Sequence, residues 1–150
     1  MAKIIRLLTC LMVGLFLGGQ ASAAEFGTRD EAKAMTEHAV AFVKSHGPDK
    51  AFTAFNAGTD GFKDRDLYVF VYNKDGVCLS HGANPAMINK PLLGLKDADG
   101  KELIKEIVGV ATTGWVDFKW RNPTTQEIMK KHAYVIHDGE LWFGVGAYEK

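Results

Sequence analysis

Five segments rich in aromatic and β-branched residues, joined mainly by turn residues, dominate the second half of the chain. Such a composition favours β-strands. Strands that follow one another through short turns pair antiparallel, because parallel neighbours need long crossover connections. The sequence therefore predicts a five-stranded antiparallel sheet, formed by residues 67–72, 77–81, 115–120, 132–137 and 141–148.

Helical patterns precede this region and interrupt it once. Thr28 and Glu31 have the spacing of a capping box, and apolar residues then recur at helical spacing as far as Gly47. Pro48 suits the first turn of a second, short helix. A third helix is expected after Glu102, where an apolar stripe appears. We therefore expect an α+β domain in which helices pack against one face of the sheet.

The first 23 residues have the features of a signal peptide. Lys3 and Arg6 are followed by an apolar run over residues 7–19, and small residues precede a cleavage site after Ala23. The apolar run is shorter than the roughly 20 residues needed to span a bilayer, which argues against a retained anchor. We expect a mature single domain over residues 24–150, located in the periplasm or secreted.

Charge and cysteine content exclude several classes of partner. The chain has 18 basic and 18 acidic residues, so removing Lys3 and Arg6 leaves 16 against 18. This near-neutral mature chain has no positive electrostatic field that would attract nucleic acid or anionic lipid. We also expect no membrane insertion after cleavage. Of the 2 cysteines only Cys78 would remain. It is either a small buried apolar residue or an exposed thiol that links two copies.

Several motifs, taken in order, resemble the type 2 single Cache domain. The resemblance covers Leu67 to Tyr148, with a long helix before it. It implies an extracytoplasmic PAS-like sheet that holds a small carboxylate, such as acetate, propionate, pyruvate or malate, beside the long loop after residue 81. The matching positions are Tyr68-x-Phe70-x-Tyr72-x-x-x-Gly76, His81, Leu95-Lys96-Asp97-x-x-Gly100, Gly114-x-Val116-x-Phe118-x-Trp120-x-x-Pro123, Lys131-x-x-Tyr134-Val135 and Gly144-Val145-Gly146-Ala147-Tyr148.

The chain also departs from the family pattern. It has Gly82 where His-Pro is usual, which affects the expected shape of the loop after His81. Most members of the family sit in chemoreceptors or histidine kinases with cytoplasmic signalling modules. This chain ends two residues after its last predicted strand, so we expect it to lack its own cytoplasmic output.

The resemblance implies that Lys131 binds the ligand carboxylate. An ammonium group in an apolar pocket would supply charge-assisted hydrogen bonds. Strict strand alternation instead places Lys130, His132 and Tyr134 together on one face. A bulge or a late start of the strand would reconcile the two patterns. We therefore prefer Lys131 and keep Lys130 as the alternative, with two solvated lysines as a third reading.

Aromatic residues at matched positions are the other ligand-binding candidates. Tyr134 and Trp120 are expected to line the pocket, although both would also suit a plain core. Tyr68, Phe70 and Trp142 fit a pocket wall or the core equally well.

His81 closes the second predicted strand at the mouth of the long loop. Its imidazole is expected to donate to a carboxylate, most strongly when protonated, so that affinity would rise as the pH falls towards 6. A structural histidine is the alternative reading.

Neither a metal site nor a catalytic motif is visible. The histidines lack metal-ligand spacing, and no Gly-x-Ser-x-Gly or Walker motif occurs. We therefore expect no catalytic residue and no cofactor. The sequence predicts a periplasmic sensor-type module that binds a small organic acid and is not an enzyme. The alternative is an interaction module that acts with a separate membrane receptor or kinase, or as a homodimer.

Overall fold

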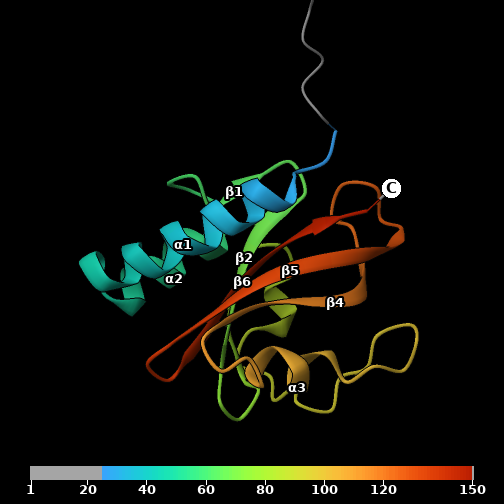
Figure 1. The fold of residues 1–150 in the computed structure, drawn as a ribbon. Coiled ribbons are helices and arrows are strands. Elements are labelled where there is room, and N and C mark those ends of the chain that lie inside the picture. The colour runs from blue at the N-terminus through green and yellow to red at the C-terminus, as the bar shows by residue number, and fades with distance from the viewer. Residues whose placement is uncertain (1–24, 150) are drawn as a thin grey trace, which may run out of the picture.

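The structure is a computed structural model, and it describes residues 25–149. The predicted signal peptide, residues 1–23, lies outside the described residues. Along the chain the elements are α1 (Arg29–His46), α2 (Pro48–Ala57), β1 (Lys63–Asp64), β2 (Leu67–Asn73), β3 (Cys78–His81), the 3₁₀ turn η1 (Pro85–Met87), α3 (Leu103–Val108), β4 (Thr113–Arg121), β5 (Ile128–Asp138) and β6 (Leu141–Tyr148) (Figure 1).

The strands form one antiparallel sheet in the order β1-β2-β6-β5-β4, and β3 also pairs with β2. All five predicted strands are present, and the two-residue strand β1 is an addition. Strand β5 begins at Ile128, four residues before its predicted start. Its pairing with β4 and β6 is regular from end to end, with Lys131 opposite Tyr148 and Tyr134 opposite Val145. No bulge therefore changes the alternation of side chains along β5.

Helices α1 and α2 cover one face of the sheet. The predicted capping box is confirmed at the start of α1, where the Thr28 N–H donates to Glu31 Oε2 at 2.7 Å and the Glu31 N–H donates to Thr28 Oγ1 at 3.2 Å. Apolar residues of both helices pack against side chains that point the same way from β2 and β6. The resulting core contains Ala32, Met35, Ala39, Phe55, Phe62, Val69, Val71, Phe143 and Val145, among others.

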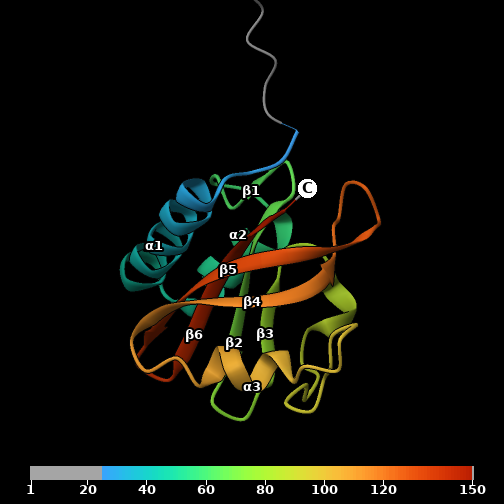
Figure 2. The same ribbon diagram turned by 45° about the vertical axis from the view of Figure 1, so that its right-hand side comes forward.

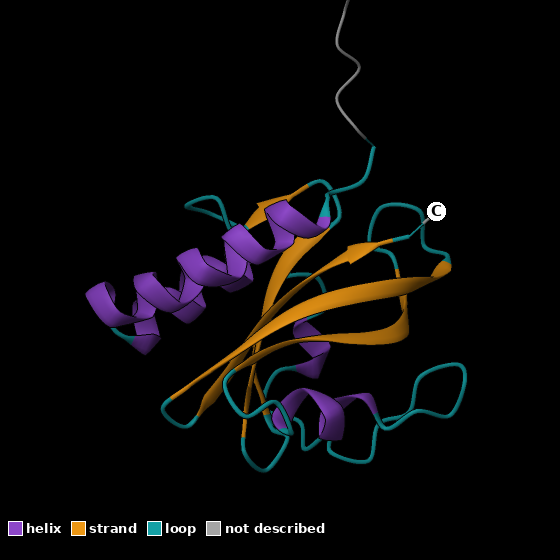
Figure 3. Cartoon of the chain, viewed as in Figure 1, coloured by secondary structure: helices purple, strands orange, loops and turns teal. Residues whose placement is uncertain are grey.

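Helix α3 and the long loop before it lie across the opposite face of the sheet (Figures 1 and 2). The cartoon in Figure 3 shows this loop running from the end of β3 to α3. The predicted α+β architecture is confirmed, and the helices divide between the two faces of the sheet. The reason is the aromatic content of the other face, which needs a cover, and the apolar stripe of α3 supplies it. This second core contains Tyr68, Phe70, Tyr72, Trp142, Val116, Phe118, Ala133 and Val135 with Leu103, Ile104 and Ile107 of α3.

Cys78 lies in the second core and is fully buried. Burial raises the pKa of its thiol to about 11. The exposed-thiol alternative is therefore wrong. Within residues 25–149, no helix has the length and apolar character that a membrane crossing requires.

Candidate ligand-binding site

Lys131 is the only lysine among the large, fully buried side chains of residues 25–149. It points from β5 into the aromatic side of the sheet and is 1% exposed. Its Nζ lies 3.8 Å from the ring centroid of Tyr68, 4.9 Å from that of Tyr148 and 5.6 Å from that of Phe70. Within the described chain, Nζ has no hydrogen-bond acceptor and no ion-pair partner. The ring faces therefore provide its main polar contact, as cation–π interactions.

Two glycines of β6 make room for this arrangement. A Cβ at Gly146 would overlap the Cγ, Cδ and Cε atoms of Lys131, and a Cβ at Gly144 would overlap the ring of Phe70. Both glycines follow the alternation of β6, in which Trp142 and Tyr148 point to the same side. The Gly144-Val145-Gly146 segment therefore lets a long cationic side chain and an aromatic ring lie flat on the sheet.

Burial controls the charge of Lys131. Removal from water disfavours the ammonium and lowers the pKa of Lys131 to about 7, while the negative charge of Asp66 acts in the opposite direction. Asp66 is itself fully buried. Its Oδ1 accepts the Gly27 N–H at 2.7 Å, and its Oδ2 accepts from Asn122 Nδ2 at 3.1 Å.

Asp66 and Asn122 were not among the predicted site residues. Both stand in polar segments that look like solvated turns, so the sequence carried no local signal of their burial.

His81 is held as a neutral ring at the end of β3. Its Nδ1 accepts the backbone N–H groups of Ala83 and Asn84, at 3.3 and 2.9 Å. In the neutral ring the proton is then on Nε2, which is left as a donor. Burial, together with the charge of Lys131, lowers the pKa of His81 to about 3. The lowered pKa argues against a cationic His81 near pH 6, and the two hydrogen bonds accepted by Nδ1 leave the neutral ring as a donor through Nε2.

A small inner cavity lies in front of Lys131. Its volume of about 10 Å³ is close to the space that one water molecule needs. Aromatic and aliphatic side chains make up most of its wall, and Lys131 and His81 add an amine and an imidazole. The lining residues are Tyr68, Phe70, Tyr72, His81, Leu103, Ile107, Phe118, Trp120 and Lys131.

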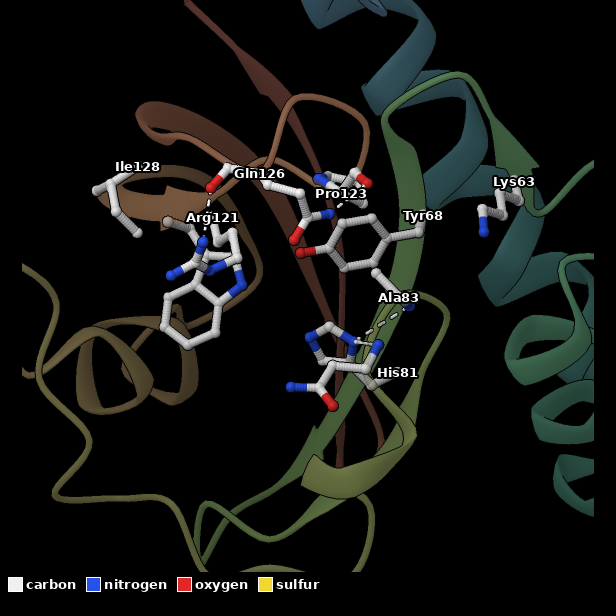
Figure 4. A pocket seen from close by; sticks show the side chains of 10 residues that line it. Lys63, Tyr68, His81, Ala83, Arg121, Pro123, Gln126 and Ile128 are labelled. Atoms are coloured by element: carbon white, nitrogen blue, oxygen red, sulfur yellow. Dashed lines mark hydrogen bonds between the residues drawn. The ribbon is translucent and has the colours of Figure 1, made fainter.

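A larger cleft of about 460 Å³ opens next to the inner cavity. Tyr68, His81 and Trp120 line both spaces, so they form the partition between them. Figure 4 shows Tyr68 and His81 facing the cleft, with Arg121 and Gln126 across from them. The arrangement gives a solvent-open vestibule that leads to an enclosed cation.

Five of the seven predicted ligand-binding residues come together here: Lys131, Trp120, His81, Tyr68 and Phe70. Lys130, the alternative to Lys131, points to the other side of the sheet, where its Nζ lies 3.1 Å from Glu149 Oε2. The structure thus distinguishes the two neighbouring lysines by position, whereas a role in ligand binding stays a prediction for all five residues.

Tyr134 lies on the opposite face of β5 from Lys131, and its predicted place in the pocket is wrong. Its ring packs against Trp115 with 5.1 Å between centroids, and Lys33 Nζ lies 5.6 Å from the ring centroid. The reason is strand geometry. In a strand with regular pairing, residues three apart point to opposite faces.

Trp142 is on the aromatic face but lines neither cavity. Its ring stacks on His137 with 3.9 Å between centroids, and its Nε1–H donates to the Val110 carbonyl at 2.9 Å. These contacts make Trp142 a core residue at the other end of β6 from Lys131.

Tyr148 lines neither cavity, but its ring contacts the Lys131 amine, and it was not among the predicted site residues. Its hydroxyl donates to the Arg121 carbonyl at 2.9 Å and lies 3.4 Å from the Tyr68 hydroxyl. Burial raises the pKa of both phenols well above their usual value, so both are neutral. Tyr148 is opposite Lys131 in the β5–β6 pairing. The sequence carried two signals for this neighbour, namely the predicted pairing of the last two strands and the place of Tyr148 in the matched C-terminal motif.

Comparisons with known proteins agree with this architecture. A family model described as Single Cache domain 2 matches residues 20–149. The sensor histidine kinase MctS of Rhizobium johnstonii is 32% identical over 100 residues, which cover 64% of this chain and 20% of that protein. The chain thus spans about one fifth of the length of this curated relative.

Two solved structures share the fold. One, from a methyl-accepting chemotaxis protein of Vibrio parahaemolyticus, has a TM-score of 0.70 and 24% identity, covering 79% of this chain and 86% of that chain. The other is described as the structural basis for carboxylic acid recognition by a Cache chemosensory domain. It has a TM-score of 0.63 and 19% identity, covering 81% of this chain and 88% of that chain.

Proposed function

The chain belongs to the Single Cache domain 2 family, and from this premise we propose that it is a periplasmic sensor module that binds a small organic carboxylate at Lys131 and is not an enzyme. The carboxylic acid recognised by the similar Cache chemosensory domain supports this ligand class. The predicted signal peptide supports the compartment.

The observation that carries the proposal is the unpaired amine of Lys131 inside an apolar cavity. An ammonium without a counter-ion is costly in such a place, by several kcal/mol. A carboxylate that enters the cavity would supply the missing partner through charge-assisted hydrogen bonds. The negative charge of the ligand and the positive charge of Lys131 would then neutralise each other.

The surrounding residues fit the rest of a small acid. His81 offers its Nε2–H as a neutral donor to a carboxylate oxygen. Leu103, Ile107 and Phe118 provide an apolar wall for a short hydrocarbon chain. The inner cavity is smaller than any of these acids, so binding requires the partition formed by Tyr68 and Trp120 to shift towards the cleft. A short acid suits this site because it demands the smallest shift.

We further propose that ligand occupancy is passed to a membrane receptor or kinase. The support is the similarity to a sensor histidine kinase and to a chemotaxis receptor domain.

The direct test is titration of the protein with acetate, propionate, pyruvate and malate, followed by thermal shift and calorimetry. Propionamide serves as the uncharged control. A ligand at 100 times its Kd adds about 2.7 kcal/mol to the free energy of unfolding, which is a readily measured shift. We expect Lys131→Met to remove the response to acids and Lys130→Met, its exposed neighbour, to retain it. Absence of any response in the wild-type protein, or an equal response in both variants, would refute the proposal.

A further inference from the structure

We propose that Lys131 is also a covalent site, at which a small 2-oxo acid forms an imine with Nζ. The inference rests on the proposed function, since it places the acid in the same cavity, and it adds a reaction that carboxylate binding does not require. Its basis is the position of Nζ, which is enclosed, lacks an acceptor and faces the inner cavity.

Lys131 differs from many of the exposed lysines in its surroundings. The amines of Lys33, Lys44 and Lys119 lie 2.6 to 3.0 Å from carboxylate oxygens, and Lys130 lies 3.1 Å from Glu149. A carboxylate at that distance favours the ammonium, which has no lone pair with which to attack a carbonyl. The Lys131 amine contacts ring faces instead, and no carboxylate of the described residues lies within ion-pair distance of it, so burial outweighs the cation–π contacts.

The electrostatic environment agrees with this geometry. Burial lowers the pKa of Lys131 to about 7, so about half of the amine is neutral at neutral pH. For an ordinary lysine the neutral fraction at pH 7 is smaller by about a thousandfold. Desolvated lysines of this kind are the usual nucleophiles in Schiff-base chemistry.

The reaction balances without any added oxidant or reductant. The lone pair of Nζ attacks the carbonyl carbon of the 2-oxo acid, and a C–N bond forms. The carbonyl oxygen leaves as water, taking one proton from the amine and one from solvent. The product is an iminium ion, whose positive charge comes from the proton taken from solvent.

The site suits an oxo acid better than a neutral carbonyl compound. In the product the iminium charge lies beside the carboxylate carried on the adjacent carbon, so the two charges remain paired in the apolar cavity. The Nε2–H of His81 is available to the same carboxylate. Enclosure behind Tyr68 and Trp120 limits the access of bulk water, which would otherwise hydrolyse the imine.

The test is reductive trapping. The protein is incubated with pyruvate and cyanoborohydride, and the adduct is located by intact mass and peptide mapping. We expect Lys131 to be labelled at least about tenfold faster than Lys130, allowing for the weaker intrinsic nucleophilicity of a less basic amine. At subsaturating pyruvate the labelling rate should rise with pH up to about 7 and then level off, because the attack needs the neutral amine. At saturating pyruvate the rise should continue to higher pH, because the bound carboxylate raises the pKa of Lys131. Propionate, which has no carbonyl, should give no adduct and should protect Lys131 from pyruvate.

Two variants separate this inference from simple binding. Lys131→Arg keeps a positive charge but presents no amine nucleophile, so it should bind propionate and form no adduct. Lys130→Met should form the adduct at the wild-type rate. If calorimetry shows carboxylate binding while trapping leaves Lys131 unlabelled, the covalent proposal is overturned and the proposed function stands. Labelling of exposed lysines at the same rate as Lys131 also overturns the covalent proposal. If the wild-type protein binds no acid at all, both the covalent proposal and the proposed function are overturned.

Discussion

The Nζ atom of Lys131 lies 3.8 Å from the centroid of the Tyr68 ring, inside the sheet's aromatic core. Two adjacent strands, β2 and β6, supply the rings of Tyr68 and Tyr148, while Lys131 comes from β5. A cation held by ring faces keeps its hydrogen-bonding capacity unused. The Lys131 amine can therefore donate to an anion, and burial, not the ring contact, is what lowers its pKa.

The affinity for a small carboxylate should fall as the pH rises above about 7. Binding needs the ammonium form, and the pKa of Lys131 in the free protein is about 7. A bound anion raises that pKa, so affinity is constant below pH 7 and weakens by up to about tenfold per pH unit above it. Calorimetry with propionate between pH 5.5 and 9 measures the slope. Lys131→Arg, whose charge does not titrate in this range, should give a flat profile; a flat wild-type profile would contradict the mechanism.

The free energy of unfolding should rise with pH between about 7 and 10.5. The pKa of Lys131 is about 7 in the folded protein and near the ordinary lysine value of 10.5 when the chain unfolds. In that window the unfolded chain binds more protons, so raising the pH favours the folded state by up to about 1.4 kcal/mol per unit. Below pH 7 the destabilisation is constant. Urea unfolding at pH 6 and pH 9 should show Lys131→Met as more stable than wild type at pH 6, with a smaller advantage at pH 9. Parallel pH profiles for the two proteins would disprove the assignment.

Replacing Gly146 by alanine should displace Lys131. The new methyl group would occupy the space of the Lys131 Cγ, Cδ and Cε atoms, and overpacking of this kind costs about 1–3 kcal/mol. Denaturant unfolding measures the loss, and thermal shift measures the accompanying loss of acid binding. Gly94→Ala is the matched control, because a Cβ at Gly94 meets no atom within 4 Å. A Gly146→Ala protein as stable as this control would show that the Lys131 side chain can adopt another conformation without cost.

Asp66→Asn should weaken both the fold and acid binding. The carboxylate of Asp66 accepts hydrogen bonds from Gly27 and Asn122, and an amide in its place leaves one donor facing another, at a cost of about 1–3 kcal/mol. Loss of its charge also lowers the pKa of Lys131 further, so less ammonium is present at pH 7. Unfolding and calorimetry at pH 6 and 7.5 test this, with Asp75→Asn in an exposed turn as the control. Unchanged affinity at pH 7.5 would rule out the electrostatic link.

Tyr134→Leu should leave the Kd for a carboxylate unchanged within about twofold, since the ring lies on the α1 side of the sheet. Tyr68→Leu removes the ring closest to Lys131 and one wall of the cavity, and should weaken binding by about tenfold or more. Calorimetry on the two variants compares the two faces directly. A larger loss of affinity in Tyr134→Leu than in Tyr68→Leu would place the ligand on the α1 side of the sheet.

The resemblance predicted that Lys131 and Tyr134 face the same pocket, but the structure places Lys131 at the inner cavity and Tyr134 on the other face of the sheet, and strand geometry explains why the two cannot share a face. The two residues are three apart in a strand with unbroken pairing, so they point to opposite faces. Alternation alone grouped Lys130, His132 and Tyr134, which indeed share a face. Alternation did not show which of the two sets of β5 side chains faces the aromatic core.

The sequence by itself determined the types of element, because the signals for these are local: the capping box at Thr28, the helical spacing in α1, and the strand segments separated by turn residues. Only the tertiary structure decided which face each side chain occupies. Both faces of β2 are covered, so Leu67 to Tyr72 are all buried and leave no polar alternation to read. The burial of Asp66, the role of Tyr148 and the charge of Lys131 depend on strands that meet across long sequence separations, and no local pattern encodes such contacts.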